Sequence, residues 1–136
     1  MNLGDFQEIE PIYNLEFDDF WKPQNLKSEL QNVSSKYIVA KENGEIVGFA
    51  GIWYSVDDAH ITNIVVRKSY RNKGIGSLLL EKLIELAKTK TSLTLEVNTK
   101  NEIAQKLYLK YGFKNLGIRK KYYDGIEDAY IMTLYF

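Results

Sequence analysis

The chain has 136 residues, a hydrophobic fraction of 45%, and 18 basic residues against 18 acidic ones. This length and composition fit one domain with a real core, and the balanced charge gives no reason to expect nucleic acid or a membrane as a partner. With no cysteine, one histidine and no close cluster of carboxylates, the chain should have neither disulfides nor a metal site. No apolar run is long enough to span a membrane and no signal peptide is visible, so we expect a cytoplasmic protein.

The first part of the chain predicts two helices. Apolar side chains recur at helical spacing over residues 5–17, where Pro11 should bend or split the element. Pro23 suits the first turn of a second helix, which would place Leu26, Leu30 and Val33 on one face.

Three strands should follow these helices, over residues 36–42, 45–55 and 60–66. Asn43-Gly44 is a strong signal for a hairpin turn between the first two strands. Gly48 and Gly51 should weaken the second strand and allow a twist or a bulge.

The third of these strands runs into a basic loop with two glycines, and a helix follows. Arg71 and Lys73 stand beside Gly74 and Gly76. The first turn of a helix leaves backbone N–H groups unpaired and carries a partial positive charge. Because glycines let an anionic ligand approach that backbone, the loop is either a phosphate site or an ordinary charged surface loop.

The spacing of the glycines distinguishes three kinds of phosphate loop. A P-loop needs a lysine before the hydroxyl residue, which Gly76-Ser77 lacks, and a dinucleotide fingerprint needs a third glycine where Leu79 stands. Glu96 lies at about the right distance for a ribose-binding acid, so the dinucleotide interpretation is weakened and stays open. The third pattern, Arg/Gln-x-x-Gly-x-Gly/Ala, is matched in full by residues 71–76, Arg-Asn-Lys-Gly-Ile-Gly.

The C-terminal part predicts a strand, a helix and two more strands. Their ranges are 92–98, 101–111, 113–122 and 129–136, with a hairpin around Asp124-Gly125. The whole order predicts an α/β fold with a mixed sheet. The strands at 61–66 and 92–98 should be parallel and joined by a right-handed βαβ crossover through the long helix.

This element order and three sequence blocks resemble the GCN5-related N-acetyltransferase (GNAT) family over nearly the whole chain. The blocks are the glycine loop, residues 95–113 with strand, Asn, Ala, Leu-Tyr and Gly-Phe, and residues 117–129, which are similar to the RimI-type branch. The resemblance implies one domain over residues 1–136, with a mixed, mostly antiparallel sheet, a central parallel βαβ unit and helices on both faces. Relatives usually open with a strand, but only residues 1–4 precede the first helical pattern here, so that strand should be very short or absent.

The resemblance also implies acetyl-CoA as co-substrate and the N-terminal alanine of a ribosomal protein as acceptor, since the RimI-type branch acetylates that group. Backbone groups of Ile64, Val65 and Val66 would bind the pantetheine arm and the thioester; on sequence alone these residues form a buried strand, and both interpretations can hold. The other residues matched to cofactor binding are Arg71, Asn72, Lys73, Gly74, Ile75, Gly76, Ser77 and Asn101. Asn is also a favoured N-cap, so Asn101 has an ordinary structural alternative.

By the same resemblance, Glu96 is the general base and Tyr108 donates a proton to the CoA thiolate. The alternatives are a polar position on an alternating strand for Glu96 and the apolar stripe of a helix for Tyr108. A carboxyl group near pKa ~4.3 is a weak base for an amine near ~8, so we expect Glu96 to have a raised pKa or to work through water. The sequence names no partner for His60, and we favour a structural role for it.

Trp21, Tyr122 and Tyr123 match the positions that line the peptide groove in relatives. Their alternatives are a tryptophan that covers the core and aromatics at the end of a strand. Two other functions stay open: acetylation of a lysine or a small amine, and a non-catalytic acyl-CoA-binding module. The presence of both Glu96 and Tyr108 argues against the second of these.

Overall fold

The computed structural model describes every residue except 18–22, 124 and 126, and for residues 121–123 it describes the backbone alone. The elements in chain order are α1 (Leu3–Ile9), η1 (Glu10–Ile12), α2 (Tyr13–Glu16), α3 (Pro23–Leu30), β1 (Ser35–Glu42), β2 (Glu45–Tyr54), β3 (Asp58–Val66), η2 (Lys68–Tyr70), α4 (Ile75–Ala87), β4 (Ser92–Asn98), α5 (Glu102–Lys110), β5 (Lys114–Tyr123) and β6 (Glu127–Tyr135). The predicted order of helices and strands is therefore confirmed.

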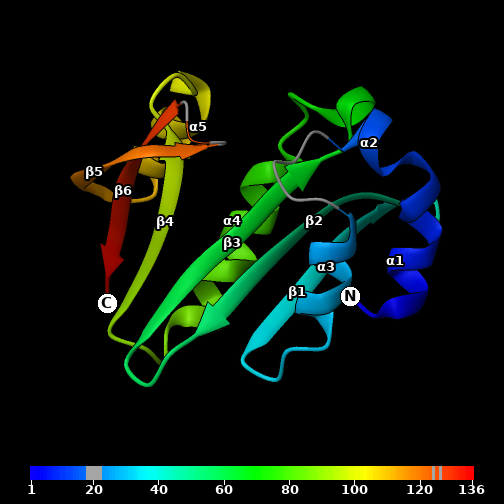
Figure 1. The fold of residues 1–136 in the computed structure, drawn as a ribbon, viewed down its shortest axis with the longest axis horizontal. Helices are drawn as coiled ribbons and strands as arrows, with labels where there is room; N and C mark the ends of the chain where they lie inside the picture. The colour runs from blue at the N-terminus through cyan, green and yellow to red at the C-terminus, as the bar shows by residue number, and fades with distance from the viewer. Residues whose placement is uncertain (18–22, 124, 126) are drawn as a thin grey trace.

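The six strands form one mixed sheet in the order β1-β2-β3-β4-β6-β5 (Figure 1). Every neighbouring pair is antiparallel except β3 and β4, which are parallel as predicted. The parallel ladder has only three residue pairs, Asp58–Ser92, Ala59–Leu93 and His60–Thr94. Beyond these pairs the two strands diverge (Figure 1), so the sheet is split at its centre.

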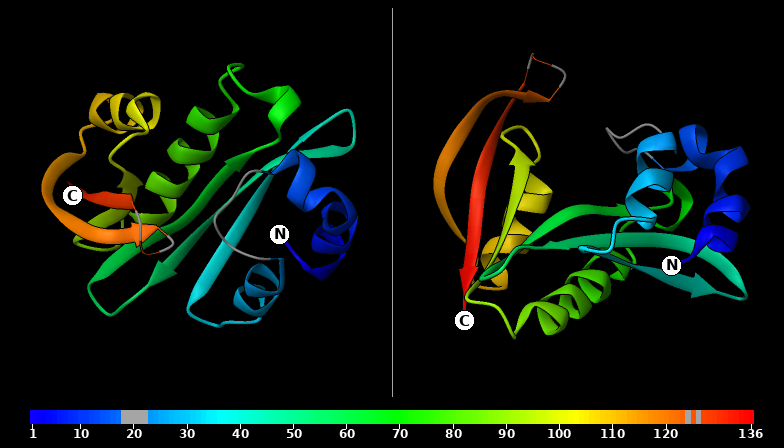
Figure 2. Two further views of the ribbon diagram at one scale, coloured as in Figure 1. Left: turned by 45° about the horizontal axis from the view of Figure 1, so that its top comes forward. Right: turned by 60° about the horizontal axis from the view of Figure 1, so that its bottom comes forward.

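Helices cover both faces of the sheet, and each face has its own core (Figure 2). On one face, α4 buries Leu79, Leu80 and Leu83 against residues of β2, β3 and β4. On the other face, side chains of α1, α2 and α3 pack with β1 and β2 around Phe49. Burial of large apolar side chains on both faces is the main force that holds the helices to the sheet.

The N-terminal segment is helical from Leu3, so within the described residues no strand precedes α1 and β1 forms one edge of the sheet. Asn2 and Asp5 form a capping box that fixes the start of α1. Pro11 splits the predicted first helix as expected, because a proline cannot donate the backbone hydrogen bond of an α-helix, and a short 3₁₀ segment takes its place. The predicted reach of the second helix to Val33 is wrong: α3 ends at Leu30 and Val33 is fully exposed.

A bulge lies between β2 and β3 next to one of the predicted glycines. Gly51 pairs with Asn63 while Ile52 pairs with Ile61, so Thr62 is an extra residue in β3. Tyr37 crosses above Gly51, and its hydroxyl group lies 2.9 Å from Thr62 Oγ1 and donates to Asn63 Oδ1 at 2.8 Å. A Cβ atom on Gly51 would lie 2.2 Å from the Tyr37 ring, so this crossing requires glycine.

Candidate active site

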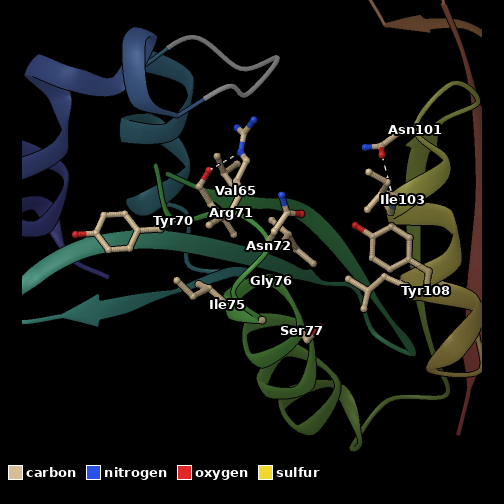
Figure 3. Close-up of a pocket in the computed structure, with 15 residues that line it drawn as sticks. Val65, Tyr70, Arg71, Asn72, Ile75, Gly76, Ser77, Asn101, Ile103 and Tyr108 are labelled. Carbon is tan, nitrogen blue, oxygen red and sulfur yellow. Dashed lines mark hydrogen bonds between the residues drawn. The ribbon is translucent and has the colours of Figure 1, made fainter. Parts of the chain in front are cut away.

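A cavity of about 600 Å³ opens where β3 and β4 separate, between the start of α4 and the start of α5 (Figure 3). Its wall consists of residues from the end of β3, the loop after it, the first turn of α4, and α5. The residues that line it are Ile64, Val65, Val66, Tyr70, Arg71, Asn72, Gly74, Ile75, Gly76, Ser77, Asn101, Ile103, Ala104, Leu107 and Tyr108.

The split between the strands exposes backbone of β3 to this cavity. Ile64, Val65 and Val66 pair with β2 on one side, but the recorded ladder with β4 has already ended at His60. Their backbone on the β4 side therefore faces the cavity instead of a neighbouring strand, while Val65 buries its side chain. A ligand with amide groups can take up hydrogen bonds along this edge in place of the missing strand.

The first turn of α4 gives the cavity a surface that suits a negatively charged group. Gly74, the N-cap residue, has φ +83°, a backbone conformation that a residue with a side chain rarely adopts, and no side chain of the described residues caps the helix. The unpaired N–H groups of the first turn and the helix dipole both favour a negative group here. A Cβ atom on Gly76 would meet only Val66 Cγ2, at 3.8 Å, so the structure has room for a ligand beside this backbone.

Most of the predicted cofactor-binding residues line the cavity. Lys73 is the one that does not, because its ammonium group lies over the Tyr70 ring, 5.1 Å from the ring centre. Arg71 lines the cavity and donates from Nε to the carbonyl of Val66 at 3.1 Å, which holds the loop against the end of β3. Sequence reasoning missed Tyr70, Ile103, Ala104 and Leu107; the last three share one side of α5 with Tyr108, a spacing that helical periodicity could have revealed.

Asn101 is an N-cap, as its structural alternative predicted, and its contact with a cofactor stays a prediction. Its Oδ1 accepts a hydrogen bond from the backbone N–H of Ala104 at 3.2 Å, which makes it the N-cap of α5. It also lines the cavity, opposite the α4 side (Figure 3).

Tyr108 combines packing with a polar group at the cavity. Its ring contacts the Phe113 ring at 5.8 Å between centres, and its hydroxyl points into the cavity (Figure 3). Burial raises the pKa of Tyr108 to about 12. Since a free thiol has a pKa of ~8.5, complete proton transfer from this phenol to a thiolate is uphill by about 5 kcal/mol. The phenol keeps its proton and can donate it in a hydrogen bond.

Glu96 lies on β4, is not among the residues that line the cavity, and contacts His60 and Arg119. Its Oε2 is 2.7 Å from His60 Nε2, and its Oε1 is 3.2 Å from Arg119 Nη1, while only 9% of its side chain is exposed. Burial acts to raise the pKa of Glu96, but the hydrogen bond and charge of His60 and the charge of Arg119 outweigh it, so the pKa is lowered. The expectation of a raised pKa is therefore wrong.

The contact between His60 and Glu96 supplies the partner that the sequence could not name for His60. His60 is the last residue of β3 that pairs with β4, opposite Thr94, and Glu96 is two positions further along β4 on the same side of the strand. The register of a parallel pair puts them together, and this register could not be read from the sequence.

The side chains of the three predicted peptide-groove residues are outside the part of the chain that the structure describes. Trp21 lies outside the described residues, and of Tyr122 and Tyr123 only the backbone is described, at the end of β5. The neighbouring Phe17 is buried and packs on Phe49 at 5.6 Å, so it belongs to the core. None of the described helices is long and apolar enough to cross a bilayer.

A split β3–β4 pair that leads to a helix N-terminus without a side-chain cap suits an extended, anionic ligand that carries amide groups. The mixed, mostly antiparallel sheet decides against the dinucleotide-binding interpretation, which requires a parallel, doubly wound sheet. Residues 6–113 match the model of the acetyltransferase (GNAT) family, which is well over half of the chain. The chain belongs to this family, and it is an acyltransferase.

Three relatives are informative. A protein of Bacillus subtilis (strain 168), provisionally named a ribosomal protein bS18-alanine N-acetyltransferase, is 40% identical over 133 residues, which cover 93% of this chain and 88% of the relative. The crystal structure of the ribosomal-protein-S18-alanine N-acetyltransferase from Escherichia coli has a TM-score of 0.88 at 32% identity, covering 99% of this chain and 90% of that one. A GNAT family acetyltransferase from Elizabethkingia anophelis, solved with acetyl-CoA bound, has a TM-score of 0.74 at 28% identity; the match covers 85% of this chain and 84% of that one.

Proposed function

We propose that this chain transfers the acetyl group of acetyl-CoA to the N-terminal alanine of a ribosomal protein. The similarity to the E. coli enzyme carries the proposal, because it extends over 99% of this chain at a TM-score of 0.88. The same proposal takes residues 1–136 as one catalytic domain that works in the cytoplasm.

The residues around the cavity fit acetyl-CoA. The pyrophosphate would bind at the first turn of α4, where the N–H groups of Ile75, Gly76 and Ser77 meet the loop from Arg71 to Gly74. The pantetheine arm carries amide groups that suit the exposed backbone of Ile64 to Val66. Acetyl-CoA supplies the thioester whose acyl group is transferred to the amine.

Glu96 is the proposed base for the substrate amine. An α-amino group with a pKa near ~8 is partly neutral at pH 7, so a modest base is sufficient to take its proton. Because the pKa of Glu96 is lowered, its carboxylate is ionised at neutral pH and attracts the ammonium form, but it holds a proton weakly. Of the two expected mechanisms, proton relay through water therefore remains.

Tyr108 is the proposed donor to the leaving sulfur. Tyr108 lies in the last turn of α5 and lines the cavity, and its raised pKa keeps the phenol protonated at any working pH. A hydrogen bond from the phenol would stabilise the thiolate as charge develops on it. Release of the thiolate does not then require complete proton transfer from Tyr108.

The test is acetyl transfer, measured by mass spectrometry, to peptides that differ only in their first residue. One further peptide has a blocked N-terminus and an internal lysine. We expect transfer to free N-termini, fastest to alanine. Transfer only to the blocked peptide would keep the chemistry and overturn the acceptor. No transfer to any peptide, with acetyl-CoA still bound, would leave small amines and a binding-only role.

A further inference from the structure

The bulge at Thr62 separates two parts of β3 that have different neighbours. Before the bulge, the ladder with β4 ends at His60. After it, the strand pairs with β2 alone, and the other edge of its backbone, from Ile64 onward, faces the cavity. Because a bulge bends a strand and increases its twist, Thr62 stands at the place where β3 turns from β4 toward the cavity.

The same bulge changes the face to which the side chains of β3 point. Ile61 belongs to the core on the α4 face, whereas Val65 packs with Phe49 in the core on the other face. In a regular strand, residues 61 and 65 would lie on the same face, because side chains alternate with a period of two. The extra residue reverses this alternation. The position of the bulge therefore also decides which backbone N–H and C=O groups point to β2 and which point into the cavity.

The hydroxyl group of Tyr37 holds this bulge from β1, across the whole width of β2. Tyr37 pairs with Gly51 of β2, and the missing side chain at Gly51 lets the ring reach β3. The hydroxyl donates to Asn63 Oδ1 at 2.8 Å and lies 2.9 Å from Thr62 Oγ1. A phenol has one proton, so a hydroxyl that donates to Asn63 accepts from the hydroxyl of Thr62. Both hydrogen bonds thus end on the bulge, at the extra residue and at the residue after it.

Burial makes these hydrogen bonds costly to lose. The side chains of Tyr37 and Asn63 are both buried, so water cannot readily replace the missing partner if the Tyr37 hydroxyl is removed. A buried polar group without a partner raises the free energy of the fold, and the bulge has to shift to relieve it. The register of β3 beyond the bulge is therefore tied to one hydroxyl group on a different strand.

We propose that the Tyr37 hydroxyl positions the cofactor, because it fixes the bulge that presents the backbone of residues 64–66 to the pantetheine arm of acetyl-CoA. This inference rests on the proposed function for the place of that arm. Tyr37 is not among the residues that line the cavity, so it acts through β3 and is a positioning residue. The proposed pyrophosphate site lies on another element, the first turn of α4. Tyr37 should therefore matter for the pantetheine half of the cofactor and not for its nucleotide half.

The first test compares two ligands by calorimetry in the wild type and in Tyr37→Phe, which keeps the ring above Gly51 and removes only the hydroxyl. The ligands are acetyl-CoA and 3′-phospho-ADP, which is the nucleotide half of CoA without the pantetheine arm. We expect the Kd of acetyl-CoA to rise about five- to ten-fold, the loss typical of about one hydrogen bond, and the Kd of 3′-phospho-ADP to stay within about two-fold. An unchanged Kd for acetyl-CoA, or an equal loss for both ligands, would overturn the proposal.

Tyr54→Phe is the matched control for the loss of a tyrosine hydroxyl. Tyr54 lies at the end of β2, donates to the carbonyl of Leu86 at 3.3 Å and is not among the residues that line the cavity. The control removes a hydrogen bond that helps to hold α4 and leaves the bulge intact, so both affinities should stay within about two-fold of the wild type. A loss of acetyl-CoA affinity as large as that in Tyr37→Phe would show a general effect of destabilisation and would overturn the positioning role.

The second test is amide hydrogen exchange in the protein without a ligand, which does not depend on the proposed function. In Tyr37→Phe, the amides of residues 61–66 should exchange about five- to ten-fold faster than in the wild type, while those of β6 keep their rates. Unchanged exchange over residues 61–66, or an equal acceleration in β6, would overturn the role of the hydroxyl in holding the bulge. A wild type that does not bind acetyl-CoA would overturn the proposed function instead, and the exchange rates would still decide whether Tyr37 fixes this strand.

Discussion

Gly51→Ala is the substitution for which the structure gives the most definite stability prediction. The new methyl group would lie 2.2 Å from the Tyr37 ring and 2.6 Å from Thr62 Oγ1, so the ring has to leave its place above β2. The backbone of Gly51 is not in the left-handed region, and the whole effect is therefore steric.

The size of the effect follows from what Tyr37 loses. Its side chain is 5% exposed, and its hydroxyl contacts Thr62 and Asn63. Two hydrogen bonds at about 1 kcal/mol each and roughly 100 Å² of newly exposed ring at ~25 cal/mol per Å² give a destabilisation of about 4 kcal/mol. At ~4 °C per kcal/mol for a chain of this size, Tm should fall by about 15 °C.

The assay is urea unfolding followed by circular dichroism, with Gly76→Ala as the matched control. Gly76 lies in the first turn of α4, where a methyl group meets only Val66 at 3.8 Å, so alanine there should stabilise the fold by a few tenths of a kcal/mol up to about 1. Gly51→Ala is then repeated in a Tyr37→Ala background, where its effect should shrink to below about 1 kcal/mol. A destabilisation below about 1 kcal/mol in the wild-type background, or the same effect in both backgrounds, would refute the account of this crossing.

Three further predictions concern the site. Gly74→Ala forces an alanine to φ +83°, so the free energy of unfolding should fall by about 1 kcal/mol. The affinity for CoA, measured by calorimetry, should also drop. An unchanged affinity would show that this loop does not bind the anionic part of CoA. Tyr108→Phe keeps the ring on Phe113 and removes the donor, so single-turnover acetyl transfer should slow about ten-fold at unchanged acetyl-CoA affinity; full activity would make Tyr108 a packing residue. Because the pKa of Glu96 is lowered in the fold, its stabilisation is complete above its unfolded pKa of ~4.3 and is lost as pH falls through its folded pKa. The free energy of unfolding should therefore fall faster in the wild type than in Glu96→Gln as the pH is lowered from 6 to 3. It is measured by urea unfolding at steps of ~0.5 pH unit, and parallel curves of unfolding free energy against pH would contradict this prediction.

Local sequence was enough to predict the elements and the position of the glycine loop before α4. Asn43-Gly44 forms the hairpin turn between β1 and β2, since both residues have positive φ and these residue types tolerate it. Pro11 splits the first helix because of its own covalent geometry. Gly74 and Gly76 stand at the start of α4, where the spacing placed them. Each of these features depends on residues within one turn or one loop, so the sequence alone contains the information.

The tertiary structure decided which distant side chains meet. Three residue pairs fix the register of β3 against β4, and that register brings His60 within 2.7 Å of Glu96 and reverses the expected direction of the Glu96 pKa shift. Arg119 contacts Glu96 from β5, although β6 lies between β4 and β5 in the sheet. Strand register follows from packing over the whole sheet, and a pKa follows from the sum of burial and nearby charge. Neither quantity is a property of a local stretch of sequence, which is why the sequence could propose a role for Glu96 but could not name the residues that contact it.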